Sequence, residues 1–226
     1  MITLTIDNKQ VEVEEGTTIL QAAEKLGIKI PTLCHHKSLA PYGACRVCLV
    51  EVGSPGRSSW VQASCVYPAQ EDQIVQTNSE RVQKTRKIMF ELLLARCPDS
   101  PVIRDLAKEY GVEETRFPKK NEDCILCGLC TRICEEQMMA KAIGFRGRGE
   151  GRSIGTPFDI QSDVCRQCGA CIYVCPACEL RCTYTEAEKA VCGGCANLSP
   201  PCIEVEQFDD MMCYMNPCVA CEAVRR

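Results

Sequence analysis

Aromatic residues make up only 5% of this 226-residue sequence, and the only two histidines are His35 and His36. No apolar run approaches the roughly 20 residues that a membrane-spanning helix needs. The first residues, M-I-T-L-T-I, lack the basic and apolar regions of a secretory signal peptide. The net charge of −4 supplies no basic excess for binding nucleic-acid phosphates. These absences argue against a membrane-inserted, secreted or nucleic-acid-binding protein, and we expect a cytoplasmic one.

Cysteine, by contrast, occurs 21 times. Such a density indicates a disulfide scaffold mainly in short secreted chains, and this chain shows no secretory signal. The cysteines are therefore interpreted as reduced metal ligands. Metal cross-links would replace part of the apolar core that the scarce aromatic residues do not provide.

The strongest motif is the run C-x2-C-x2-C-x3-C, which occurs twice between residues 124 and 175. In two-cluster ferredoxins, three cysteines of such a run bind one 4Fe–4S cluster and the fourth binds the other cluster. The predicted ligand sets are Cys124, Cys127, Cys130 and Cys175 for one cluster, and Cys165, Cys168, Cys171 and Cys134 for the other. Pro176 follows the second run as in that pattern, whereas Glu135 follows the first. A pair of four-cysteine zinc sites is the alternative interpretation.

The N-terminal region predicts a β-grasp domain. Residues 2–6 and 11–15 alternate apolar and polar side chains around a turn at residues 7–9, which indicates a hairpin. A capping box of Thr18 and Gln21 predicts a helix that ends before Gly27. The spacing C-x10-C-x2-C-x16-C follows, and it predicts a 2Fe–2S cluster whose sulfurs accept hydrogen bonds from amides of small loop residues. The ligands would be Cys34, Cys45, Cys48 and Cys65, with a zinc site as the alternative.

Two helices are predicted after this domain. Ser79 is a candidate N-cap for a helix to Ala95, and Pro101 begins a second helix that Gly111 ends. The apolar stripe expected to form the buried face of the first helix is Val82, Ile88, Met89, Leu92 and Leu93.

Cys97 between the helices is interpreted as a buried thiol. The glycine- and arginine-rich stretch at residues 144–155 lacks a phosphate-binding fingerprint and is interpreted as a mobile basic loop.

The last 46 residues are expected to need metal to fold, because they show little apolar periodicity. The preferred interpretation is one further 4Fe–4S cluster, with a zinc site as the alternative. Its ligands would be Cys192, Cys195, Cys202 and Cys213. The spacing does not assign the remaining cysteines of this region, which are Cys178, Cys182, Cys218 and Cys221.

This order of parts resembles a known family. It is similar to the large iron–sulfur subunit of complex I. The shared parts are a 2Fe–2S domain with ten residues between its first two cysteines, a linker containing R-K-I-M-F-E-L-L-L-A, and two cysteine runs for 4Fe–4S (cubane) clusters. They are also similar to the electron-transfer subunits of NAD(P)-linked hydrogenases, formate dehydrogenases and electron-bifurcating complexes. That family usually carries a His-x3-Cys-x2-Cys-x5-Cys motif after the first linker helix. Here the corresponding place holds Cys97 alone, so the cluster of that motif is expected to be absent.

We therefore expect an α+β protein of four parts. These are a β-grasp 2Fe–2S ferredoxin domain at 1–78, a helical linker at 79–119, a two-cubane bacterial-ferredoxin-like domain at 120–180 and a metal-stapled tail at 181–226. No nucleophile–base pair, acid pair or dinucleotide fingerprint occurs, so no catalytic residue is predicted.

The clusters predict single-electron transfer. The resemblance implies a flavin-containing NAD(P)H dehydrogenase subunit as one partner. It implies a hydrogenase- or formate-dehydrogenase-type subunit, or a ferredoxin, as the other. Two alternatives are the iron–sulfur subunit of a quinone-linked membrane dehydrogenase and a zinc-stapled scaffold protein; the x10 spacing disfavours the first.

Overall fold

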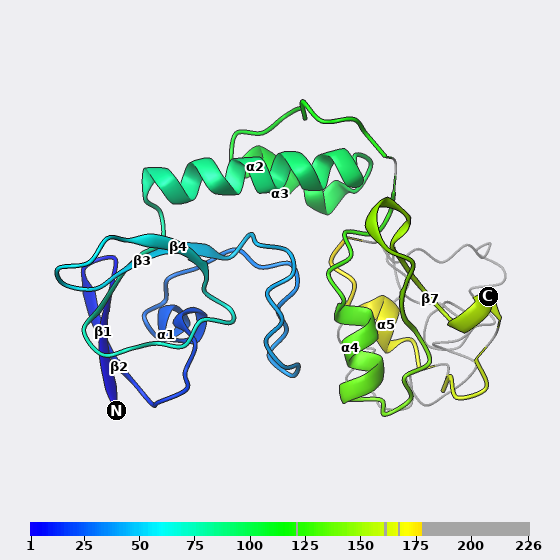
Figure 1. The fold of residues 1–226 in the computed structure, drawn as a ribbon, viewed down its shortest axis with the longest axis horizontal. Coiled ribbons are helices and arrows are strands. Elements are labelled where there is room, and N and C mark those ends of the chain that lie inside the picture. The colour runs from blue at the N-terminus through cyan, green and yellow to red at the C-terminus, as the bar shows by residue number, and fades with distance from the viewer. Residues whose placement is uncertain (121, 161, 167, 178–226) are drawn as a thin grey trace, which may run out of the picture. The chain divides into compact units, whose positions relative to one another are not determined.

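The computed structural model describes residues 1–120, 122–160, 162–166 and 168–177. They fall into two compact units, of which the first spans Met1–Cys127 and the second begins at Gly128 (Figure 1). The predicted tail site and the unassigned tail cysteines lie outside the described residues.

The first unit contains a five-stranded sheet with the strand order β2-β1-β5-β3-β4. Strands β1 and β5 are parallel, and the other neighbouring pairs of this sheet are antiparallel. The strands are β1 (Ile2–Ile6), β2 (Lys9–Val13), β3 (Leu49–Gly53), β4 (Trp60–Ala63) and β5 (Gln73–Gln76). Leu4, Ile6 and Val13 are buried in its core, as the predicted alternation requires. The fold is the expected 2Fe–2S ferredoxin type.

The first hairpin is tighter than predicted. Asp7 and Asn8 alone form its turn, with φ of 46° and 65°, so the second strand begins at Lys9 instead of residue 11. Two central residues with positive φ are characteristic of a type I′ turn, whose twist suits two paired strands. The Asp7 carboxylate accepts hydrogen bonds from the backbone amide (2.8 Å) and the hydroxyl (2.5 Å) of Thr77. These bonds hold the turn against the end of β5.

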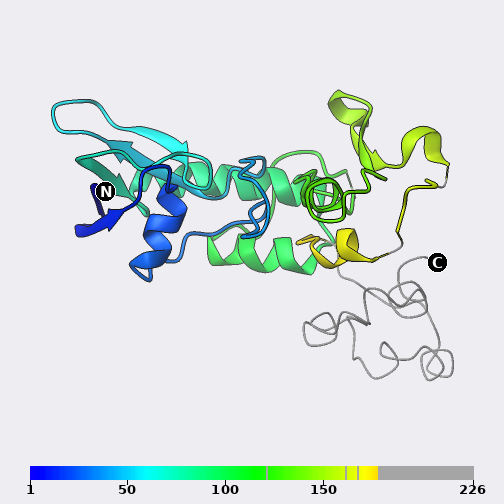
Figure 2. The same ribbon diagram turned by 90° about the horizontal axis from the view of Figure 1, so that it is seen from below.

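Helix α1 (Ile19–Lys25) begins at the predicted capping box. The Gln21 amide donates to the Thr18 hydroxyl at 3.3 Å, and the Thr18 amide donates to the Gln21 side chain at 2.9 Å. Gly27 follows with a φ of 71°, which confirms the predicted left-handed stop. Figure 2 shows α1 beside the sheet, and its buried residues share one core with the strands. Cys48 and Cys65, two members of the first group of cysteines, belong to the same core.

Helices α2 (Glu80–Arg96) and α3 (Pro101–Glu109) pack against each other within the first unit (Figures 1 and 2). Ser79 caps α2 as predicted, because its hydroxyl accepts a hydrogen bond from the Val82 amide at 3.3 Å. The rings of Phe90 and Tyr110 stack with their centroids 4.8 Å apart. Helix α2 also packs against β3 and so connects the helical pair to the sheet.

The predicted apolar stripe of α2 is only partly confirmed, because Val82 is buried but Ile88, Met89 and Leu93 are half-buried. The buried row is Val82, Arg86, Phe90 and Leu94, whereas Leu92 is 44% exposed. Residues four apart lie on one face of a helix, and this row satisfies that spacing throughout. The row includes an arginine, so hydrophobicity alone could not identify it.

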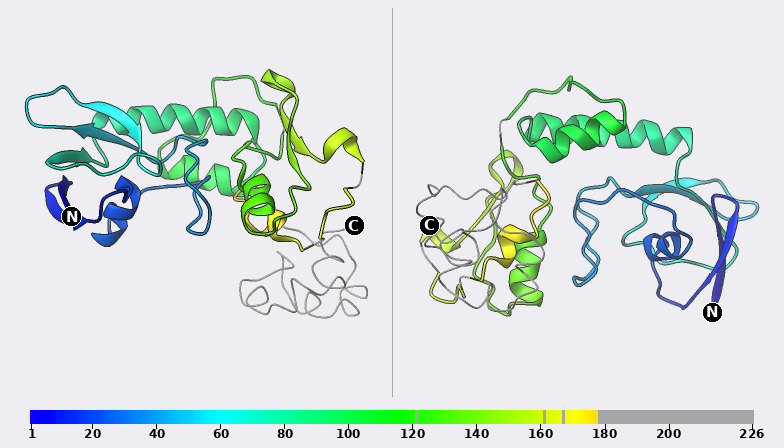
Figure 3. Two further views of the ribbon diagram at one scale, coloured as in Figure 1. Left: turned by 60° about the horizontal axis from the view of Figure 1, so that its bottom comes forward. Right: turned by 180° about the vertical axis from the view of Figure 1, so that it is seen from behind.

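The second unit contains helix α4 (Leu129–Glu136), the short helix α5 (Ala170–Tyr173) and a two-stranded sheet. Helices α4 and α5 pack against each other, as both views of Figure 3 show. The strands are β6 (Gly144–Arg146) and β7 (Ser153–Gly155). The 3₁₀ turn η1 (Gly149–Gly151) connects them, and η2 (Pro157–Asp159) follows β7.

The prediction of a loop at residues 144–155 is wrong, because these residues form a β-hairpin. Strand β6 pairs antiparallel with β7, and Phe145 lies opposite Ile154. The Arg152 guanidinium lies 4.1 Å from the centroid of the Phe145 ring, and the Arg146 side chain donates to the Ser153 hydroxyl at 2.9 Å. The arginines thus contribute to the hairpin through cation–π and hydrogen-bond contacts.

Candidate iron–sulfur sites

The four cysteines predicted to bind the 2Fe–2S cluster come together in the first unit. Cys34 follows α1, Cys45 and Cys48 precede β3, and Cys65 follows β4. The Cys48 and Cys65 sulfurs are 3.2 Å apart, and the Cys34 side chain interacts with those of Cys45 and Cys65. All four are free thiols, and Cys34, Cys48 and Cys65 are buried. The set thus offers four sulfur donors from loops anchored by the sheet.

The thiol groups of this site influence one another's ionisation. Hydrogen bonds with the side chains of Cys45 and Cys65 lower the pKa of Cys34, and hydrogen bonds with Cys65 lower the pKa of Cys48 to about 6. Hydrogen bonds with Cys34 and Cys48 raise the pKa of Cys65. Contacts among these thiols thus lower the pKa of Cys34 and Cys48 and raise that of Cys45 and Cys65. The thiolate is the form that binds metal.

The loop between Cys34 and Cys45 supplies backbone hydrogen bonds to sulfur. The Cys45 amide donates to the Cys34 sulfur at 3.4 Å, and the Ala44 amide also interacts with this sulfur. This confirms that amides of the small-residue loop approach a sulfur. Ser64, a buried residue absent from the prediction, donates its hydroxyl to the Cys48 carbonyl at 2.7 Å. Such bonds orient cluster ligands and influence reduction potential.

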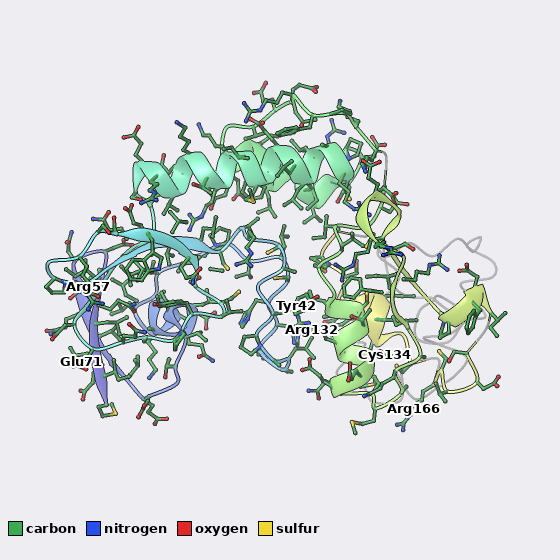
Figure 4. The ribbon with its side chains drawn as sticks, viewed as in Figure 1. Tyr42, Arg57, Glu71, Arg132, Cys134 and Arg166 are labelled. Carbon is green, nitrogen blue, oxygen red and sulfur yellow. The ribbon has the colours of Figure 1, made fainter. Side chains whose placement is uncertain are left out.

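A second group of cysteines surrounds a pocket in the second unit. The pocket has a volume of about 270 Å³, and its lining includes Cys134, Cys165, Cys168 and Cys171. These are the four cysteines of one predicted cubane ligand set. Figure 4 marks Cys134 on α4 and Arg166 in the segment before α5. The structure thus brings the fourth cysteine of the first run to three cysteines of the second, as the crossed ligand pattern requires.

Burial and neighbouring sulfurs affect this pocket as well. Burial, followed by the charges of Cys168 and Cys134, raises the pKa of the Cys171 thiol to about 11. The Ala142 amide donates to the Cys134 sulfur at 3.3 Å. Apolar side chains such as Met138 and Ile172 complete the lining. A mostly apolar cavity with several sulfurs fits a 4Fe–4S cluster, because the sulfurs provide the ligands and apolar side chains form much of the remaining wall.

The two cysteine runs share a local turn. Gly128 precedes α4 with a φ of 75°, and Gly169 precedes α5 with a φ of 73°. Each glycine stands between the second and third cysteine of its run. An L-residue with a side chain rarely adopts this left-handed conformation. The repeated C-x2-C spacing is therefore matched by a repeated backbone geometry.

The other predicted cubane set is Cys124, Cys127, Cys130 and Cys175. Cys124 and Cys127 belong to the first unit; the Leu126 amide donates to the Cys124 sulfur at 3.3 Å, and Cys127 is buried. In the second unit, Cys130 lies in α4, and Cys175 follows α5. The assignment of these four to one cluster stays a prediction.

Cys97 is a fully buried thiol, as expected. Burial is the main cause that raises its pKa to about 12, which keeps it protonated at neutral pH. Among the described residues, no three His, Cys, Asp or Glu side chains form a site for a single metal ion.

The sequence matches two protein-family models. Residues 1–80 match a 2Fe-2S iron-sulfur cluster binding domain, and residues 123–184 match a 4Fe-4S dicluster domain. With the two groups of converging cysteines, these matches define an iron–sulfur protein that joins one 2Fe–2S domain to a domain for two 4Fe–4S clusters. The chain resembles the iron–sulfur portion of the large complex I subunit and the related subunits of NAD(P)-linked hydrogenases.

Three similar proteins illustrate this resemblance. The mitochondrial NADH-ubiquinone oxidoreductase 78 kDa subunit of Neurospora crassa is 34% identical over 202 residues, which cover 77% of this chain and 27% of the relative. NADPH-Fe(3+) oxidoreductase subunit alpha of Geobacter sulfurreducens is 37% identical over 201 residues, which cover 78% of this chain and 23% of the relative. A crystal structure of an NAD+-reducing [NiFe]-hydrogenase in the H2-reduced state is 29% identical, with a TM-score of 0.58. That match covers 69% of this chain and 75% of the hydrogenase chain.

The chain spans about a quarter of the length of these curated relatives. None of the helices in the described part of the chain is both long and apolar enough to cross a membrane.

Proposed function

We propose that this chain is an electron-relay subunit of an NAD(P)-linked oxidoreductase complex. The observation that carries the proposal is the presence of two separate groups of cysteines, each in a domain whose family binds iron–sulfur clusters. Iron–sulfur clusters exchange single electrons, and the surrounding protein adjusts their potential and their access to partners.

The proposed ligand sets follow the two domains. Cys34, Cys45, Cys48 and Cys65 bind the 2Fe–2S cluster; Cys165, Cys168, Cys171 and Cys134 bind one cubane; Cys124, Cys127, Cys130 and Cys175 bind the other. The convergence of the first set and the shared pocket of the second support these two assignments, and the spacing of the two cysteine runs supports the third. In each site the chain supplies the sulfur donors, and backbone amides hold individual sulfurs in place. The clusters supply the electron-accepting chemistry when they are bound.

We further propose a third 4Fe–4S cluster, or zinc, at Cys192, Cys195, Cys202 and Cys213. The spacing of these cysteines is its only support. The four-part division at residues 78, 119 and 180 is likewise a proposal.

The proposed partners are a flavin-containing NAD(P)H dehydrogenase subunit and a low-potential catalytic subunit or ferredoxin. The names of the similar proteins, which include NADH-, NADPH- and hydrogenase-linked enzymes, support this choice. The proposed location is the cytoplasm, because the cysteines proposed as metal ligands need a reducing environment.

A reduction experiment tests the relay. The anaerobically purified chain should be bleached in its visible absorption by dithionite but not by NADH or NADPH alone, because no dinucleotide site is expected. Adding a flavin-containing diaphorase subunit from an NAD+-reducing hydrogenase should let NADH or NADPH reduce the chain. Rapid reduction by NAD(P)H without any flavoprotein would contradict the proposal, as would failure of dithionite to reduce it.

A further inference from the structure

Arg86 is a buried cation beside the first group of cysteines. Its side chain is 3% exposed, on the face of α2 that packs against β3. Its terminal nitrogen Nη2 donates a hydrogen bond to the Leu49 carbonyl at 2.5 Å. Leu49 follows the proposed ligand Cys48 directly in the chain. The guanidinium is thereby bound to the backbone of the residue next in sequence to a proposed ligand of the 2Fe–2S site.

The described residues compensate only in part for the burial of this charge. The Nε atom of Arg86 has no hydrogen-bond partner, and within the described residues no carboxylate forms an ion pair with the guanidinium. The Tyr110 ring, whose centroid is 5.9 Å away, provides a cation–π contact. Burial is the largest cause and lowers the pKa of Arg86, while the charges of Tyr110, Cys48 and Asp7 and a hydrogen bond with the Tyr110 side chain act in the opposite direction. Arginine still remains protonated at physiological pH.

A buried charge without a full partner is costly, so its position needs an explanation. A purely apolar contact between α2 and β3 would be served as well by leucine or methionine. The negative charge that a thiolate-bound cluster adds at Cys48 would be a further counter-charge for this guanidinium. The burial of Arg86 next to the residue that follows Cys48 is the observation on which the inference rests.

We propose that Arg86 is a tuning residue that raises the reduction potential of the 2Fe–2S cluster. The proposal rests on the proposed ligand set at Cys34, Cys45, Cys48 and Cys65. Reduction adds one electron and breaks no bond to the chain, so the reduced site carries one more negative charge than the oxidised site. A fixed positive charge in a low-dielectric interior stabilises the reduced form more than the oxidised form. Arg86 lies outside the matched 2Fe–2S domain at residues 1–80, so the linker helix supplies this charge.

The test is an EPR-monitored redox titration of the full chain with its clusters, with dithionite as reductant. Arg86→Gln keeps an N–H donor but removes the charge, and it should lower the equilibrium constant for 2Fe–2S reduction about tenfold, which is about 59 mV for one electron. Arg86→Lys keeps the charge and should shift the midpoint by much less. Arg81→Gln removes a positive charge from the same helix at a side chain that is 58% exposed, and it should leave the midpoint unchanged because water and salt screen that charge.

A second variant keeps the proposal testable if Arg86→Gln fails to incorporate the cluster. Met89→Glu retains Arg86 and adds a negative charge at a partly buried position that packs against the core of the sheet. It should also lower the midpoint. An unchanged midpoint in a fully loaded Arg86→Gln or Met89→Glu protein would overturn the tuning role and leave the relay proposal intact. Absence of any 2Fe–2S signal in the unmodified chain would instead overturn the ligand assignment.

Discussion

Replacing Cys168 by alanine should remove one 4Fe–4S cluster and leave the 2Fe–2S EPR signal intact. Cys168 shares its pocket with Cys134, Cys165 and Cys171, and a cubane that loses one of four thiolates is no longer held. The iron content should fall by up to about four atoms per chain. Iron and sulfide analysis together with EPR of the dithionite-reduced protein measures the result.

The control for this change is Met138→Leu, which alters the same pocket without touching a sulfur donor to the cluster. The two side chains have similar volumes, so all clusters should remain. Loss of the 2Fe–2S signal along with the cubane would contradict separate sites in the two domains. Retention of every cluster in Cys168→Ala would show that Cys168 is not a ligand.

The second large effect is expected at Cys48. Cys48→Ala should abolish the 2Fe–2S signal and lower the iron content by about two atoms per chain, while the signals of both cubanes remain. The reason is geometric: Cys48 is buried, its sulfur lies 3.2 Å from that of Cys65, and Cys65 in turn interacts with Cys34. EPR at two temperatures separates the two cluster types.

Cys97→Ala is the matched control, because Cys97 is equally buried in the same unit but belongs to no proposed ligand set. Its 2Fe–2S signal and iron content should equal those of the unmodified chain. If Cys97→Ala lost the 2Fe–2S signal as Cys48→Ala does, burial of a thiol rather than metal ligation would explain both results.

Local sequence signals predicted much of the first unit. The capping box at Thr18 and Gln21 places the start of α1, and the Ser79 cap places the start of α2, because side-chain hydrogen bonds to the first turn act over three residues. The spacing of the cysteines was equally informative about the metal sites. The regular cysteine runs predicted that Cys134 and Cys168 would meet, and the structure brings both to one pocket.

Contacts between distant segments could not be predicted in this way. Strand β5 was missed because its pairing with β1 joins residues nearly seventy positions apart, and its short sequence shows little periodicity. The buried face of α2 was predicted only in part, because Arg86 lies on it and contacts the Leu49 carbonyl and the Tyr110 ring, which belong to other elements. The hairpin of β6 and β7 was mistaken for a loop because each strand pairs over only three residues and the segment is rich in glycine and arginine, which do not indicate a strand.

The most direct test of the account is the cluster content of the chain purified without oxygen. We predict a brown protein with acid-labile sulfide, whose reduced form shows EPR signals of one 2Fe–2S and at least two 4Fe–4S clusters. A colourless protein that contains zinc, or no metal, and that accepts no electrons from dithionite would contradict it.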